Sequence, residues 1–88
     1  MNNTIFDPTA LKDVITWSRQ EPKLVKKIFE LIGDIHKHPF EGLGKPEGLK
    51  HQLKGCWSRR ITDEHRLIYK VLPEGHIYIL SVHGHYTQ

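Results

Sequence analysis

The sequence predicts a single small α+β domain, in which an N-terminal helical hairpin packs on a twisted antiparallel β-sheet. Residues 8–37 place apolar side chains at helical spacing, whereas residues 57–82 alternate apolar and polar side chains as β-strands do. A chain of 88 residues has room for one hydrophobic core. We therefore expect residues 1–88 to form one domain.

The N-terminal segment is predicted to form a short strand followed by a helix. Thr4-Ile5-Phe6 is short and apolar enough to form a strand, and Asp7-Pro8 places a good N-cap before a proline at the first helical position. The helix should end before Pro22, because a proline disfavours helical geometry in the residue that precedes it. Its expected apolar side consists of Leu11, Val14, Ile15 and Trp17.

A second helix is predicted from Pro22, where apolar residues recur at positions i, i+4 and i+7. It should end at residues 36–39, because cationic side chains are favourable near the carbonyl groups at a helix C-terminus and Pro39 prevents continuation. His36 and His38 have no cysteine or carboxylate at ligand spacing nearby. We interpret them as helix-end residues rather than metal ligands.

A β-hairpin is predicted from Trp57 to Val71, with Asp63-Glu64 as its turn. Strand alternation assigns Arg59 and Arg60 to opposite faces. An arginine presented from a rigid sheet suits a phosphate-bearing ligand, since a guanidinium is permanently charged and can bind two oxygens. A solvated sheet face is the alternative interpretation.

The segments on either side of the hairpin supply further candidates. Residues 40–48 form a loop without the P-loop spacing, and residues 49–53 and 76–82 are predicted strands. Glu47 lies among cationic residues, so it either balances local charge or acts as a general base. His83 and His85 would share a face of an extended strand, but no third metal ligand can be named.

Composition and charge restrict the class of partner. Lys and Arg number 13 against 10 Asp and Glu, which gives a net charge of +3 and a pI near 9.1. This balance favours anionic partners. Cys56 is the one cysteine, so we expect no disulfide and a reducing cytoplasmic location. No segment approaches the roughly 20 apolar residues of a membrane span, so we expect no membrane partner.

One carboxylate, one imidazole and several cations are sufficient to cleave RNA without a metal or a thiol. The RNA 2′-hydroxyl is the nucleophile, and the protein must deprotonate it, stabilise charge at phosphorus and protonate the leaving 5′-oxygen. DNA has no 2′-hydroxyl, so this chemistry predicts selectivity for RNA.

Several sequence motifs resemble the YoeB toxins of the RelE-like superfamily over nearly the whole chain. The motifs are Pro39-Phe40-Glu41-Gly42, Gly44-Lys45-Pro46-Glu47, Leu49-Lys50-His51, Trp57-Ser58-Arg59-Arg60-Ile61, Asp63-Glu64-His65-Arg66-Leu67-Ile68-Tyr69 and His85-Tyr86. The resemblance implies a RelE-like microbial RNase fold. It also implies a ribosome-dependent mRNA interferase, the toxin of a bacterial type II toxin–antitoxin pair.

The resemblance also implies roles for individual residues. Glu47 would be the general base, Arg66 would stabilise the transition state, and His85 would protonate the leaving group. The expected products are a 2′,3′-cyclic phosphate and a 5′-hydroxyl, with no cofactor and no metal. The residues expected to bind the RNA are Lys50, His51, Arg60 and Tyr86.

The partners implied by the resemblance are mRNA on the 70S ribosome, a cognate YefM-like antitoxin, and operator DNA bound through the toxin–antitoxin complex. The sequence leaves the choice between monomer and homodimer open. The alternative function is a basic RNA-binding or regulatory module, a catalytically inactive homologue that binds an antitoxin and operator DNA. Departures from the family pattern are Gly48, Cys56, His83-Gly84, and the last residues Thr87 and Gln88.

Overall fold

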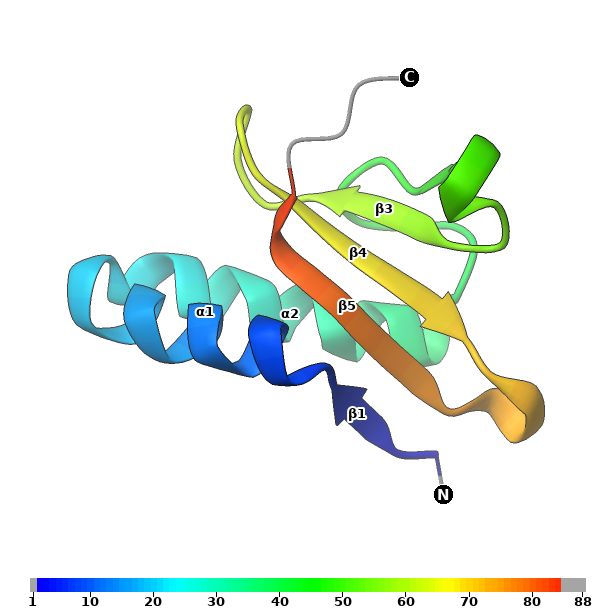
Figure 1. Ribbon diagram of the computed structural model, residues 1–88, viewed down its shortest axis with the longest axis horizontal. Coiled ribbons are helices and arrows are strands. Elements are labelled where there is room, and N and C mark those ends of the chain that lie inside the picture. The colour runs from blue at the N-terminus through cyan, green and yellow to red at the C-terminus, as the bar shows by residue number, and fades with distance from the viewer. Residues whose placement is uncertain (1, 85–88) are drawn as a thin grey trace.

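The computed structural model describes residues 2–84, which form a helical layer on one side of a β-sheet (Figure 1). The first half holds β1 (Thr4–Phe6), α1 (Pro8–Gln20) and α2 (Pro22–Lys37). The second half holds β2 (Glu47–Gly48), the 3₁₀ helix η1 (His51–Leu53), β3 (Trp57–Arg60), β4 (Arg66–Val71), the 3₁₀ turn η2 (Pro73–Gly75) and β5 (Ile77–Gly84). The predicted α+β class and helical hairpin are confirmed.

The sheet has the order β1-β5-β4-β3-β2. The pairs β2–β3, β3–β4 and β4–β5 are antiparallel, as predicted, but β1 and β5 are parallel. The prediction of a wholly antiparallel sheet is therefore wrong for one pair. Parallel strands need a long connection, and the helices together with the other strands supply it between β1 and β5.

Asp7 joins the start of α1 to the sheet. Its Oδ2 accepts a hydrogen bond from the Thr9 N–H at 3.0 Å, which caps the helix, and its Oδ1 accepts one from the Tyr78 hydroxyl at 2.8 Å. These hydrogen bonds, that of Tyr78 first, lower the pKa of the Asp7 carboxyl below its ordinary value. The N-cap predicted at Asp7 is confirmed.

The predicted apolar side of α1 is partly wrong. Ala10 and Val14 are buried, whereas Leu11 and Ile15 have 49% and 47% of their surface exposed. The helix is rotated so that the small Ala10 lies against the sheet. The main core, between the helices and the sheet, consists of Ala10, Val14, Ile28, Leu31, Ile32, Ile35, Ile61, Leu67, Tyr69, Ile77, Ile79 and Val82.

A second, smaller core lies under the segment that precedes β3. The strand predicted over residues 49–53 is wrong, because His51 adopts a left-handed φ of 59° and η1 forms there instead. The segment folds back, and the Leu49 N–H donates to the Cys56 carbonyl at 2.9 Å. This second core contains Leu49, Cys56 and Ile68, with Leu53 and Leu80 packed against it.

The predicted hairpin is confirmed, with Trp57 opposite Tyr69 and Arg60 opposite Arg66. The last strand begins one residue later than predicted and extends to Gly84. Within the described residues, neither helix is long and apolar enough to cross a membrane.

Candidate functional site

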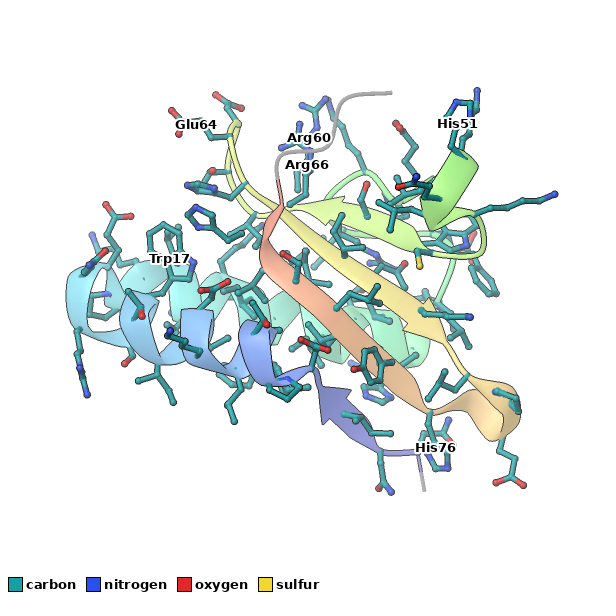
Figure 2. All side chains as sticks on the ribbon, in the orientation of Figure 1. Trp17, His51, Arg60, Glu64, Arg66 and His76 are labelled. Atoms are coloured by element: carbon teal, nitrogen blue, oxygen red, sulfur yellow. The ribbon has the colours of Figure 1, made fainter. Side chains whose placement is uncertain are left out.

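Arg60 and Arg66 form a cross-strand pair at the end of the β3–β4 hairpin (Figure 2). Residues directly opposite in an antiparallel pair point to the same face of the sheet. Because the neighbouring Arg59 is buried on the helix side, both guanidinium groups lie on the other face, Arg60 exposed and Arg66 half-buried. Two like charges in this position repel each other, so a bound anion would stabilise the pair.

The β3–β4 turn orients the Arg66 guanidinium. Its Nη1 donates to the carbonyl oxygens of Thr62, Asp63 and His65 at 2.9, 3.2 and 3.3 Å. The Thr62 hydroxyl accepts the N–H of His65 at 3.0 Å and so holds the turn itself. Nε and Nη2 carry three further N–H donors suited to a phosphate. The turn therefore presents a preoriented cation.

Glu47 lies on the same face as the arginine pair. It is exposed on β2, opposite Ser58 of β3, and Ser58 and Arg60 are two residues apart on one strand. Such diagonal neighbours lie roughly 7–8 Å apart, and their Cβ atoms are somewhat closer. The structure thus brings three predicted site residues, Glu47, Arg60 and Arg66, to one side of the sheet.

Lys50 and His51 are both exposed, at the start of η1. This helix precedes β3, whereas Arg60 is the last residue of β3. Figure 2 accordingly shows His51 at the outer end of η1, apart from Arg60 and Arg66. An RNA that contacts both the start of η1 and the arginine pair would have to extend along β3.

His85 and Tyr86 lie outside the described residues, so their predicted roles stay predictions. The register of β5 nevertheless bears on the site, because Gly84 pairs with Arg66. Gly84 directly precedes His85 in the sequence. The described end of the chain therefore reaches the arginine pair.

No group of three or more metal-ligating side chains occurs within residues 2–84. His36, which we interpreted as a helix-end residue rather than a metal ligand, lies in the last turn of α2 and hydrogen-bonds the Thr4 hydroxyl, with 2.7 Å between Nε2 and Oγ1. Because His85 lies outside this range, the metal-free site remains a prediction.

A cluster of three rings beside the end of β5 was not predicted. The His65 and His83 rings are 4.6 Å apart, and Trp17 lies 5.0 and 5.4 Å from them. A small cavity of about 120 Å³ lies beside Trp17 and His83. Trp17, placed on the apolar side of the predicted first helix, was the available signal in the sequence, but its partners His65 and His83 are distant in sequence.

The comparisons with solved structures define the class of protein. The structure described as the YoeB dimer from Staphylococcus aureus superposes with a TM-score of 0.89 at 44% identity, covering 97% of this chain and 98% of that chain. The YoeB–YefM complex from the same organism gives 0.87 at 45% identity, covering 98% and 99%. The fold is thus that of the toxin of a bacterial toxin–antitoxin pair, since a further S. aureus structure with this fold is described as a YoeB–YefM toxin-antitoxin complex.

Sequence comparisons identify the family. A family model described as "YoeB-like toxin of bacterial type II toxin-antitoxin system" matches residues 6–86. Toxin YoeB of Escherichia coli K12 is 48% identical over 82 residues, which is 93% of this chain and 96% of that protein. The chain belongs to the YoeB-like toxin family, and the resemblance found in the sequence is confirmed.

Proposed function

We propose that this toxin is a ribosome-dependent mRNA interferase, an endoribonuclease that cuts mRNA in the A site of the 70S ribosome and so inhibits translation. One observation carries the proposal. Arg60 and Arg66 are paired on the sheet face that also holds Glu47, and Gly84, directly before His85, pairs with Arg66. This is the set of groups that metal-independent RNA cleavage needs.

In this mechanism the RNA 2′-oxygen attacks the adjacent phosphorus while the bond from phosphorus to the 5′-oxygen breaks. Glu47 accepts the proton of the 2′-hydroxyl, and His85 donates a proton to the leaving 5′-oxygen. Arg66, held by its turn, stabilises the charge that develops on the phosphoryl oxygens. The products are a 2′,3′-cyclic phosphate and a 5′-hydroxyl.

The remaining predicted residues bind the substrate. Arg60, Lys50 and His51 would hold the RNA backbone along β3, and Tyr86 would stack on a base. Neither a metal nor another cofactor takes part. Binding that depends on phosphate contacts weakens as salt concentration rises.

A YefM-like antitoxin is the proposed partner, and operator DNA would be bound through the toxin–antitoxin complex. The YoeB–YefM complex from S. aureus supports the antitoxin. The YoeB dimer from the same organism supports a homodimer as one state of the free toxin.

Cleavage of mRNA in a reconstituted translation reaction tests the function, with cut sites mapped by primer extension. Glu47→Ala, Arg66→Ala and His85→Ala should each reduce the cleavage rate by about 10²-fold or more. Glu30→Ala and Lys23→Ala are matched controls, because they remove exposed charges from α2 in the helix layer. Both controls should cut at the wild-type rate.

Two outcomes would overturn parts of the proposal. Unchanged cutting in all three site variants would remove the catalytic assignment, and absence of cutting by the wild type would leave an inactive homologue that binds its antitoxin. Ribosomes need magnesium, so a chelator is added at a magnesium concentration that keeps them intact. Loss of cutting under this condition would exclude metal-independent chemistry.

A further inference from the structure

Arg59 is the largest fully buried side chain among the described residues, and the proposed mechanism does not use it. Its Nη1 donates to Asp34 Oδ2 at 2.5 Å, and its Nε donates to the Tyr69 hydroxyl at 3.2 Å. Asp34 comes from α2 and Tyr69 from β4, so the guanidinium joins the helix layer to the sheet.

The same guanidinium also binds the loop that follows α2. Nη1 donates to the Leu43 carbonyl at 3.1 Å, and Nη2 donates to the carbonyls of His38 and Glu41 at 2.5 and 2.8 Å. Charge-assisted hydrogen bonds of this kind are strong and directional. Three backbone oxygens within six residues are thus fixed by one side chain.

Asp34 and Tyr69 bind the loop as well. The Leu43 N–H donates to Asp34 Oδ2 at 2.9 Å, and the Tyr69 hydroxyl donates to the Pro39 carbonyl at 2.5 Å. A Cβ at Gly42 would lie 2.2 Å from Asp34 Oδ2, so the loop backbone lies directly against the carboxylate. We call Arg59, Asp34 and Tyr69 the buried clamp.

The clamped loop leads directly to Glu47. The Arg60 N–H donates to the Gly44 carbonyl at 2.7 Å, which attaches the end of the loop to β3. Lys45 and Pro46 are the two residues between that bond and Glu47 on β2. The position of Glu47 opposite Ser58 therefore depends on where the clamp holds the loop.

Stability alone does not explain this arrangement. Replacing a buried ion pair by packed apolar residues is often neutral or stabilising, so a buried charge is weak evidence for a purely stabilising role. An apolar pair, however, cannot fix the direction of carbonyl groups. A small displacement of a catalytic group, of about 1 Å, can cost roughly 10²-fold in rate.

We propose that the buried clamp is a positioning unit, which sets the place of the Glu47 carboxylate in the cleavage site without contacting RNA itself. The inference rests on the proposed function, since it assigns a role to residues that support the general base.

Tyr69→Phe is the mildest test, because it removes the two hydrogen bonds of the hydroxyl and keeps the ring. We expect kcat for mRNA cleavage on the ribosome to fall by between about 10- and 100-fold while KM changes little. The acid limb of the pH–rate profile should also shift, since the surroundings of the general base change. A purely structural tyrosine would change the folded fraction and leave both quantities as they are.

Tyr78→Phe is the matched control. It also removes a tyrosine hydroxyl with a side-chain partner, Asp7, but that partner is the cap of α1 and is not part of the clamped loop. Its kcat and pH–rate profile should equal those of the wild type. Equal kcat values for Tyr69→Phe and Tyr78→Phe would overturn the inference.

The double variant Arg59→Met/Asp34→Leu separates positioning from stability. Replacing both charges avoids the unpaired Asp34 carboxylate that Arg59→Met alone would leave, so the double variant should be more stable than Arg59→Met, as judged by its unfolding transition. The folded double variant should lose cleavage at least as severely as Tyr69→Phe. Wild-type cleavage by this folded variant would contradict the inference. If it does not fold, Tyr69→Phe alone decides the matter.

Amide hydrogen exchange tests the clamp without any assay of cleavage. Exchange at the Arg60 N–H, which bonds to Gly44, should accelerate at least fivefold in Tyr69→Phe and stay unchanged in Tyr78→Phe. Retained cutting by Glu47→Ala would overturn the proposed catalytic role, whereas equal Arg60 exchange in the two tyrosine variants would overturn the clamp. The two failures are therefore distinguishable.

Discussion

Arg59 and Arg60 are adjacent on β3 and chemically identical, yet the fold uses them in opposite ways. Arg59 has no exposed surface and donates five hydrogen bonds to side chains and backbone. Arg60 is exposed on the other face, opposite Arg66. A strand sends successive side chains to opposite faces, so one arginine joins the layers and the other remains available to a ligand. Position in the fold, rather than residue type, decides the role.

Replacing each arginine by the uncharged methionine should give the largest difference between them, measured as the free energy of unfolding. Arg59→Met leaves Asp34 without its buried partner and removes the charged donor of three carbonyls, so the free energy of unfolding should fall by about 3–5 kcal/mol. Arg60→Met removes an exposed charge and should change it by no more than about 0.5 kcal/mol. Urea denaturation measures both. Similar losses of stability in the two variants would mean that Arg59 does not stabilise the loop that follows α2.

Glycine substitutions sharpen the comparison at the backbone of the clamped loop. Gly44 has a φ of 78°, and a Cβ there would lie 2.9 Å from Leu31 and 3.1 Å from the Arg60 carbonyl oxygen. Gly44→Ala should therefore cost roughly 2–4 kcal/mol, from backbone strain and overpacking together.

Gly55→Ala is the control for strain alone. Gly55 has a φ of 95°, but no heavy atom lies within 4 Å of its Cβ position. We expect a loss of about 1–2 kcal/mol by urea denaturation. If the two alanine variants lose equal stability, close packing of Gly44 against β3 contributes nothing.

The smallest expected effect is the pH dependence that Asp34 confers. The Leu43 N–H and then the Arg59 guanidinium lower the pKa of the Asp34 carboxyl below its ordinary value of 3.8. Its stabilisation is therefore fully present above that value and is lost as pH falls through the lower folded-state pKa. Asp34→Asn should flatten the acid limb of stability against pH, and urea unfolding between about pH 5 and pH 2 measures this.

Asp7 supplies the internal control for that experiment, because its pKa is also lowered and it remains in the Asp34→Asn variant. A residual acid limb should therefore persist. An acid limb unchanged by Asp34→Asn would show that the carboxylate does not stabilise the folded state through its charge.

Local pattern was sufficient to predict the elements whose geometry is set locally. The helix starting at Pro22 follows from its apolar spacing, and alternation through Trp57 and Arg60 predicted both the hairpin and the different faces of the two arginines. Alternation also brings Arg66 beside Arg60. The position of Glu47 on the same face came from family resemblance rather than from any local pattern.

Other features depend on contacts that local pattern does not encode. Leu11 and Ile15 fit an apolar helical stripe, yet they are exposed and Ala10 is buried in the core between the helices and the sheet. His51 takes a left-handed conformation without being glycine, which ended the predicted strand. Arg59 donates mostly to backbone carbonyls, and every residue has a carbonyl, so the sequence does not reveal these partners.

The parallel pairing of β1 with β5 also governs the order in which the molecule can assemble. β5 is the last strand in sequence but lies between β1 and β4 in the sheet. During synthesis, β1 therefore has no partner until residues 77–79 have emerged. Contacts between such distant residues slow folding, because a long loop must close first. Gly84, which pairs with Arg66, belongs to the same last strand, β5. The complete cationic face therefore forms late during synthesis of the chain.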